Sequence, residues 1–336
     1  MKRKILSSLI LAGLVMYFGF SPDSAWAKEK VEEKFEKTVS LPGDGQVTLS
    51  NISGNIEVTS WNKNEVLIKA LKVSKADSME KARENAGLVK IEVIEERNAV
   101  HIKTEYPKNK FRSRSASVSV DFWVTIPGRA AADISSVSGD IIMVEIGGNA
   151  DAETVSGDVD LSNMTGLLRA KSVSGDIKVV NAFKGVDCRS VSGDLDIRDI
   201  TGDAKLKSVS GDINLMTLRD GKVGAETVSG DIDLDGIQDA RYVEAGSVSG
   251  EITYTGSVHP RGRYYLKSHS GEITMAIPSN SAFDLEAKTF SGSIDSDFEI
   301  TISGKISKRE IRGVVNDGGA RLELKTFSGD IVLKKR

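Results

Sequence analysis

Apolar and polar positions alternate in short segments along most of the chain, and the segments themselves repeat. Between residues 131 and 336, apolar residues recur two and four positions after a glycine, and five and seven positions before it. A spacing of two is the period of a β-strand, whose successive side chains point to opposite faces. Each repeat is therefore expected to hold two short strands that meet at the glycine, followed by a looser return loop.

The glycine lies in a Ser-Gly core that an acidic residue usually follows. Its spacing is 18 residues over five consecutive copies and 19 to 21 residues over the next four. The turn glycines of the repeat are Gly139, Gly157, Gly175, Gly193, Gly211, Gly230, Gly250, Gly271, Gly292 and Gly329. An earlier copy surrounds Gly54. A fixed period of this kind is typical of a stacked repeat architecture.

One repeat cannot bury its apolar side alone, whereas coils stacked in register bury it against each other. Successive coils would lie about 4.8 Å apart, so that like residues form ladders. Each fully buried Ile, Val or Leu contributes about 1.5–3 kcal/mol. The sequence therefore predicts an all-β chain. It is a β-solenoid, similar to a β-helix, with coils of 18 to 21 residues and an N-terminal β-rich cap containing one short helix.

The residues around the glycine suggest how the chain turns. Glycine tolerates a positive φ, the preceding Ser can bond nearby backbone, and the following Asp can close an Asx-type turn. The position two before the glycine is Val in most copies and then becomes His269, Phe290 and Phe327. It is one residue out of phase with the inward positions. Either a bulge buries it, which we favour, or it forms an exposed apolar stripe.

Three regions are expected along the chain. Residues 1–27 resemble a secretory signal peptide, with a basic start, an apolar run over residues 5–20 and small residues at Ala25 and Ala27. An uncleaved membrane anchor is the alternative. Residues 28–130 form a β-rich capping region, and residues 131–336 form the solenoid with a C-terminal segment that closes its other end.

The capping region has its own pattern. The residues around Gly54 match the repeat and predict a founding coil. Residues 76–86 favour a short helix that ends at Gly87, residues 89–94 and 100–104 a hairpin, and residues 118–126 a long strand.

Composition and reactive residues exclude several functions. The formal net charge is −3 and the isoelectric point about 5.8, which argues against a nucleic-acid partner. The one cysteine, Cys188, cannot form an internal disulfide and lies in an inward column, so we expect it to be buried. His101, His259 and His269 show no metal-ligand spacing. No catalytic residue or cofactor is predicted, because a repeat multiplies equivalent residues whereas an active site needs one distinctive cluster.

The acidic position after the glycine is the best candidate for a ligand site. Like charges about 4.8 Å apart repel by roughly 1 kcal/mol in water, so something should relieve them. Turn hydrogen bonds and basic residues of the other strand, such as Arg169, Lys171 and Arg189, offer one explanation. A calcium ion shared by neighbouring coils offers another. The candidate calcium ligands are Asp158, Asp176, Asp194, Asp212 and Asp231.

The founding copy LSNISGNI at residues 49–56, the serial SVSGDI copies and the final DGGA and TFSGDI segments resemble one bacterial family. It is the "putative adhesin" family with β-strand repeats, a domain of unknown function. The resemblance covers about residues 36–336. It implies a β-solenoid at or outside the cell membrane and an adhesive role, and it carries no catalytic residues.

The leading functional hypothesis is an exported, non-catalytic envelope or surface protein that binds glycan or protein through a repetitive β face. It would reside in the periplasm, at the cell surface or outside the cell. One alternative is a periplasmic structural or envelope-stress scaffold, with end-to-end self-association as a further option. A weaker alternative is a carbohydrate-active β-helix enzyme.

Overall fold

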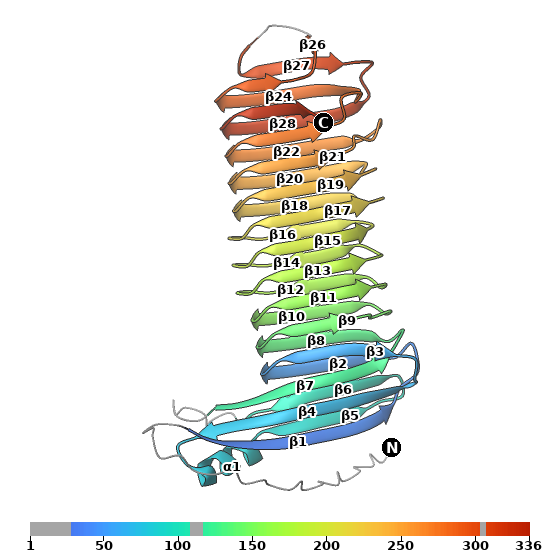
Figure 1. Ribbon diagram of the computed structural model, residues 1–336, viewed down its shortest axis with the longest axis vertical. Helices are drawn as coiled ribbons and strands as arrows, with labels where there is room; N and C mark the ends of the chain where they lie inside the picture. Colours follow the sequence, from blue (N-terminus) through green and yellow to red (C-terminus); the bar gives the residue numbers. More distant parts are fainter. Residues whose placement is uncertain (1–27, 108–116, 303–306) are drawn as a thin grey trace.

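The computed structural model describes residues 28–107, 117–302 and 307–336 and shows a long rod made of two facing β-sheets (Figure 1). One sheet has 14 strands and the other has 15. Through most of the rod each coil places one strand in each sheet, and equivalent strands of successive coils pair in parallel. The predicted all-β solenoid is confirmed.

The 14-stranded sheet contains, in spatial order, β1 (Glu29–Ser40), β4 (Glu65–Ala76), β7 (Ser117–Pro127), β3 (Ile56–Trp61), β9 (Ile141–Val144), β11 (Val159–Met164), β13 (Ile177–Ala182), β15 (Leu195–Thr201), β17 (Ile213–Arg219), β19 (Ile232–Gln238), β21 (Ile252–Gly256), β23 (Ile273–Ile277), β29 (Ile331–Lys335) and β25 (Ile294–Ser296).

The 15-stranded sheet contains, from the opposite end of the rod, β26 (Thr301–Ile302), β27 (Glu310–Val315), β24 (Phe283–Ser291), β28 (Ala320–Ser328), β22 (Arg263–Ser270), β20 (Tyr242–Ser249), β18 (Lys222–Ser229), β16 (Ala204–Lys207), β14 (Val186–Arg189), β12 (Leu168–Lys171), β10 (Ala150–Ser156), β8 (Ala131–Ser138), β2 (Gln46–Ser53), β6 (Ala99–Glu105) and β5 (Lys90–Glu95).

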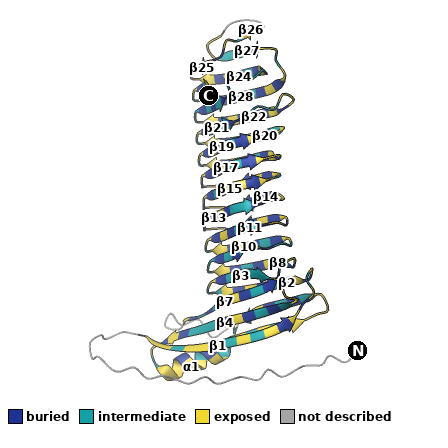
Figure 2. Cartoon of the chain, turned by 45° about the vertical axis from the view of Figure 1, so that its right-hand side comes forward, coloured by how far each residue is buried: buried dark blue, intermediate teal, exposed yellow. Residues whose placement is uncertain are grey.

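The core is one continuous stack between the sheets, and buried positions alternate with exposed ones along its strands (Figure 2). The pairing matches residues at the repeat spacing: Val159 lies beside Ile177, and Ile177 beside Leu195. In the facing sheet Cys188 lies between Ala170 and Leu206. Cys188 is fully buried, as expected, and this burial raises the pKa of its thiol.

The corner glycines are required by close stacking more than by backbone conformation. Only Gly54, Gly139, Gly292 and Gly329 among the corner glycines have φ in the left-handed region, so the predicted positive φ holds for a minority of them. A Cβ on Gly193 would lie 2.1 Å from the carbonyl oxygen of Gly175 in the preceding coil. No side chain fits in that space, and the same short approach recurs along the rod.

The opposite corner is as regular as the first, although the sequence suggested a looser return loop. Residues at this corner stand 18 positions apart and share a left-handed backbone conformation, with φ of 59° at Asn163, 60° at Asn181 and 56° at Asp199. The Asn181 side-chain amide donates to Oδ1 of Asn163 over 3.0 Å. The next residue of each coil, such as Ala182 or Ile200, points inward and is buried. Both corners therefore hold the stack in register.

The N-terminal strands continue both sheets. The predicted founding coil is β2 and β3, which pair in parallel with β8 and β9. The predicted hairpin is β5 and β6, and the predicted long strand is β7. β1, which alternates charged residues with Val31, Phe35 and Val39, was not predicted and forms an edge against β4.

The predicted short helix is α1 (Met79–Leu88), which begins later than expected and contains Gly87. It starts at Ser78, whose hydroxyl accepts a hydrogen bond from the Lys81 amide. No helix within the described residues is long and apolar enough to cross a membrane. The predicted signal peptide at residues 1–27 lies outside the described residues.

The last repeat of the sequence is not the last coil of the rod. β28 and β29 lie between the coil of β22 and β23 and the coil of β24 and β25 (Figure 1). The chain thus skips one coil position, forms β24 and β25, crosses through β26 and β27, and then returns to fill the gap. The end itself is formed by β24, β26 and β27 in one sheet and by β25 in the other, so the last repeat lies one coil inside it.

Gly193→Ala is expected to lower the free energy of unfolding by about 1–3 kcal/mol, because the new methyl group overlaps the Gly175 carbonyl. Urea denaturation measures the loss. Gly224→Ala in β18 is the control, since its Cβ would meet nothing within 4 Å. It should be neutral or stabilising by about 0.4–1 kcal/mol. Equal effects of the two changes would contradict the stacking argument.

Candidate functional site

A column of buried Ser and Thr residues links the coils at the Ser-Gly corner. These residues stand three positions before each glycine, and most of their hydroxyls donate to the glycine carbonyl of the preceding coil. Within the described residues, the buried hydroxyls of Ser136 and Ser190 have no hydrogen-bond partner. Examples are Thr227 to Gly211 over 3.2 Å and Ser268 to Gly250 over 3.0 Å. The Ser directly before the glycine, which we expected to bond the backbone, is exposed instead. Sequence reasoning missed this inward column, although its Ser/Thr content was visible.

Asn51 occupies the equivalent position in the founding coil and ends the column. Its amide nitrogen donates to the carbonyls of Ser53, Gly54 and Val120, and its oxygen accepts a hydrogen bond from Thr104 over 2.8 Å. These four bonds satisfy a buried amide side chain where the regular repeat stops. The founding coil is thereby tied to β7 and β6 on the side away from the solenoid.

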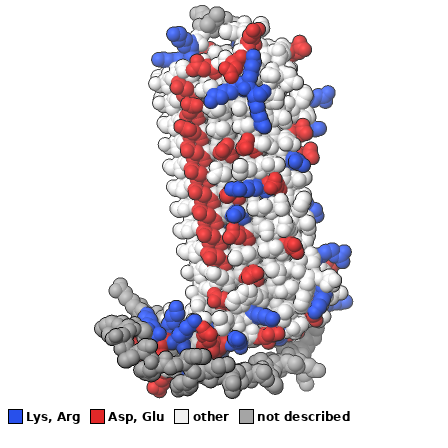
Figure 3. Space-filling model, in the orientation of Figure 1, with Lys and Arg blue, Asp and Glu red and all other residues white. Residues whose placement is uncertain are grey.

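The acidic residues after the glycines form a line along one edge of the rod, which we call the acidic ladder (Figure 3). The acidic ladder consists of Asp140, Asp158, Asp176, Asp194, Asp212, Asp231, Glu251 and Glu272. Each of its aspartates accepts the backbone N–H of the next acidic residue, as Asp194 does from Asp212 over 2.8 Å. The same bond runs from Asp158 to Asp140 and from Glu251 to Asp231. The expected Asx-type turn within one coil is therefore wrong: the Asp side chain bonds the following coil.

The hydrogen bonds of the acidic ladder provide the relief of repulsion that the sequence left open. Asp158, Asp176, Asp194, Asp212 and Asp231 each use Oδ1 for this bond. Calcium takes six to eight oxygen ligands. In the part of the chain that the structure describes, no group of three or more His, Cys, Asp or Glu residues could hold a metal ion. The geometry favours the hydrogen-bond explanation over the calcium hypothesis.

The basic residues of the other strand form ion pairs with acidic residues of their own sheet, rather than with the acidic ladder. Arg189 bonds Asp187 over 2.9 Å, and Lys171 bonds Glu153. Lys207 bonds Glu226 over 2.6 Å. These pairs are largely exposed, so each contributes at most about 1 kcal/mol.

The residue two positions before the glycine is exposed. The favoured prediction, a bulge that buries it, is therefore wrong, and the alternative of an exposed apolar stripe is confirmed. The pairing keeps its register through this region, with Thr154 beside Ser136 and Ser156 beside Ser138. Because the Ser/Thr residue points inward, the next residue points outward. We call the resulting line the apolar stripe. In spatial order it consists of Ile52, Val137, Val155, Val173, Val191, Val209, Val228, Val248, His269, Phe327 and Phe290.

The C-terminal end of the apolar stripe is aromatic. The rings of His269 and Phe327 stack with centroids 4.9 Å apart, and those of Phe327 and Phe290 with centroids 4.7 Å apart. Phe327 lies in the middle because the last repeat is inserted between the two coils that carry the other rings. Phe290 is 63% exposed. A line of exposed apolar residues of this length is unusual on a protein surface.

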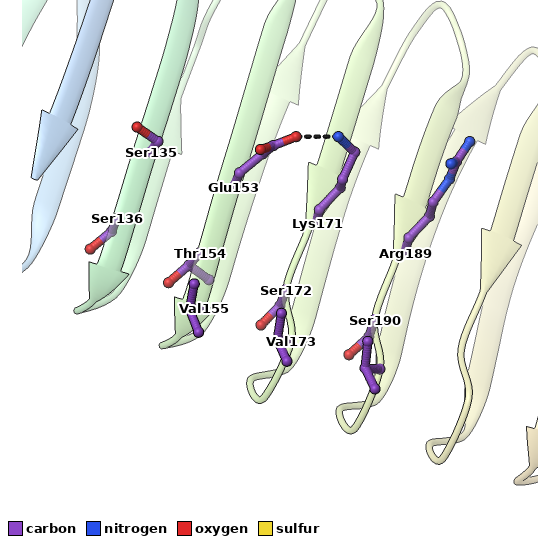
Figure 4. A pocket seen from close by; sticks show the side chains of 11 residues that line it. Ser135, Ser136, Glu153, Thr154, Val155, Lys171, Ser172, Val173, Arg189 and Ser190 are labelled. Carbon is purple, nitrogen blue, oxygen red and sulfur yellow. Dashed lines mark hydrogen bonds and ion pairs between the residues drawn. The ribbon is translucent and has the colours of Figure 1, made fainter. Parts of the chain in front are cut away.

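A shallow hollow of about 390 Å³ lies beside the stripe on β8, β10, β12 and β14 (Figure 4). Val155 and Val173 line one side, and Glu153, Lys171 and Arg189 line the other. The buried Ser/Thr column runs between them. The stripe thus has a polar, charged margin that can orient a partner.

Comparison with protein families identifies the chain. The model of the family described as Toastrack DUF4097 matches residues 16–197 and 165–334. The chain belongs to this family. Its members form a domain family of unknown function, so Toastrack DUF4097 membership defines the fold and leaves the partner open. Comparison with curated proteins finds no match.

Solved structures are similar along most of the chain at low identity. A "putative adhesin" from Bacteroides fragilis NCTC 9343 is 12% identical, with 90% of this chain and 97% of that chain covered and a TM-score of 0.31. An adhesin of the same description from Parabacteroides distasonis ATCC 8503 is 10% identical, with 90% and 97% covered and a TM-score of 0.32. A "putative lipid binding protein" from the same organism has 10% identity, the same coverage and a TM-score of 0.27. At these scores the three structures carry no argument about the function of this Toastrack DUF4097 chain.

Asp194→Asn and Asp194→Ala together isolate the hydrogen bond of the acidic ladder. Asn55 already accepts the Asp140 amide through its side-chain oxygen over 3.0 Å, so an amide can replace the carboxylate. Both variants remove the same charge. The Asn variant should therefore be more stable than the Ala variant by about 0.5–1.5 kcal/mol in urea denaturation. Equal stability of the two would show that the bond contributes nothing.

Proposed function

We propose that this protein is an exported, non-catalytic binding protein of the bacterial cell envelope or surface that holds a glycan or protein partner along the apolar stripe. The observation that carries the proposal is the unbroken line of exposed Ile, Val, His and Phe side chains, one from every coil. The predicted signal peptide at residues 1–27 supports export to the periplasm, the surface or the medium.

A rigid rod suits such a role. Each stripe residue is fixed by a coil that pairs with its neighbours on both sides, so little side-chain or backbone freedom is lost on binding. Val191 and Val209 are 44% and 46% exposed, which leaves apolar area for a partner to cover. An extended partner would gain a small contribution from each coil, and the aromatic end would add the largest single contacts.

The ends of the rod are poorly suited to end-to-end assembly. β1, at the N-terminal edge, carries many Lys and Glu residues, and charged side chains discourage strand pairing between molecules. At the other end, β25 has three residues and β26 has two. Short edge strands offer few free backbone groups. These features favour a lateral contact through the stripe over a fibre-forming scaffold.

A triple variant, Val173→Ser, Val191→Ser and Val209→Ser, is expected to abolish retention of the partner while leaving the melting temperature nearly unchanged. Exposed substitutions usually alter stability by less than about 0.5 kcal/mol each. A glycan array and a pull-down from envelope fractions measure the retention. Leu167→Ser with Phe183→Ser is the matched control, because these residues are exposed and lie off the stripe.

Undiminished retention by the triple variant would contradict the proposal. Retention of glycan or of one surface protein by the unmodified chain supports a binding role, whereas capture of envelope assembly proteins alone supports the scaffold alternative. Turnover of a polysaccharide that a single substitution abolishes would establish the carbohydrate-active enzyme instead.

A further inference from the structure

An exposed tryptophan stands at the N-terminal end of the 14-stranded sheet, away from the apolar stripe. Trp123 lies in the middle of β7 with its side chain on the outer face and is 44% exposed. Its neighbours on that face are Glu57 of β3 and Lys69 of β4, each directly opposite it across the strand pairing. Cross-strand partners on one face lie about 4.5–5.5 Å apart at Cβ. A carboxylate and an ammonium group therefore flank the indole on either side.

A hollow of about 320 Å³ surrounds this tryptophan. Besides Trp123, Glu57 and Lys69, it is lined by Thr59 and Thr125, whose hydroxyls form a hydrogen bond of 3.2 Å with each other. Within the described residues, neither the Glu57 carboxylate nor the Lys69 ammonium has an ion pair or side-chain hydrogen bond. Both groups are thus free to bond a ligand.

We propose that Trp123, Glu57 and Lys69 form a carbohydrate-binding site for an unbranched neutral glycan. The apolar face of a pyranose ring can pack on the indole, which combines a large apolar surface with rigid placement. Glu57 accepts hydrogen bonds from sugar hydroxyls, Lys69 donates to them, and the two threonines can do either. An apolar platform with a few convergent polar groups is the usual composition of a small-molecule site.

The charge of the site selects a neutral ligand. Glu57 and Lys69 have opposite charges on the two sides of Trp123, so neither an anionic nor a cationic polymer is favoured over a polyol. The site lies on the outer face of a continuous sheet, where β9 extends the surface beyond β3. A linear chain of several sugars can cross such a face, whereas an enclosed pocket would admit only a chain end.

The site differs from the apolar stripe in face, strands and residues, so the two proposals fail independently. The apolar stripe follows the strands of the 15-stranded sheet, whereas Trp123 lies on the 14-stranded sheet, and the aromatic end of the stripe lies at the opposite end of the rod. Substitutions in the apolar stripe leave the Trp123 site intact, and substitutions at Trp123 leave the apolar stripe intact.

Calorimetric titration of the full chain with cellotetraose, chitotetraose and maltotetraose tests the site. At least one tetrasaccharide is expected to bind, and Trp123→Ala should weaken that binding by about tenfold or more. Trp123→Tyr, which keeps an aromatic face and replaces the indole N–H donor by a phenol O–H, should retain most of the affinity. Glu57→Ala should weaken binding several-fold without lowering the melting temperature.

Trp61 provides the matched control. It lies at the end of β3 on the same sheet, with Lys63 over its ring at 4.4 Å and its indole nitrogen bonded to the Glu65 carbonyl. Trp61→Phe should keep both the affinity and the sugar-dependent change in tryptophan fluorescence, whereas Trp123→Phe should lose the fluorescence change. Absence of binding by all three tetrasaccharides at millimolar concentration, or unchanged binding by Trp123→Ala, would overturn the proposal.

Discussion

The rod depends on the close approach of successive coils at the Ser-Gly corner. There the glycine carbonyl of one coil lies against the glycine of the next, and in most coils a Ser or Thr hydroxyl of that next coil donates to the same carbonyl. The acidic side chain beyond the glycine then accepts the next backbone N–H. Because all three contacts join equivalent residues, they allow one register only. The buried Ile, Leu and Ala columns follow from that register and supply most of the hydrophobic stabilisation.

The same corner explains why the acidic ladder and the apolar stripe are so regular. The two features differ in whether the corner requires their side chains. The corner itself needs the acidic ladder, whose carboxylates bond the following coil. The hydrogen bonds of the corner do not involve the side chain at the outward position, so they do not require Val there. A merely solvated position would be free to hold polar or charged residues, as the equivalent outward positions at Glu153, Lys171 and Arg189 do. The repeated Val is consistent with the contact proposed along the stripe.

Much of this fold could be predicted because the repeat itself reports which residues are equivalent. The inward columns, the founding coil around Gly54, the hairpin and the burial of Cys188 all follow from spacing. The roles within the corner could not be assigned in this way. A Ser three residues before the glycine and a Ser one residue before it have the same chemistry and the same phase along a strand. Only the path of the chain as it leaves the strand at the corner decides which one is buried. The Trp123 site was also missed, because Glu57, Lys69 and Trp123 come from three strands that the sequence does not show to be neighbours.

The place of the last repeat in the rod could not be predicted either, because the spacing of repeats along the chain does not give their order in space. β24 and β25 form before β28 and β29 in the sequence, yet their coil contacts the rest of the solenoid through β28 and β29. Without β28 and β29, the coil of β22 and β23 would have an open edge, and no ring would lie between Phe290 and His269. Insertion of Leu324, Ile331 and Leu333 completes the core there. The same insertion places Phe327 in the aromatic stack, so the C-terminal segment joins the end of the rod and finishes the stripe in one step.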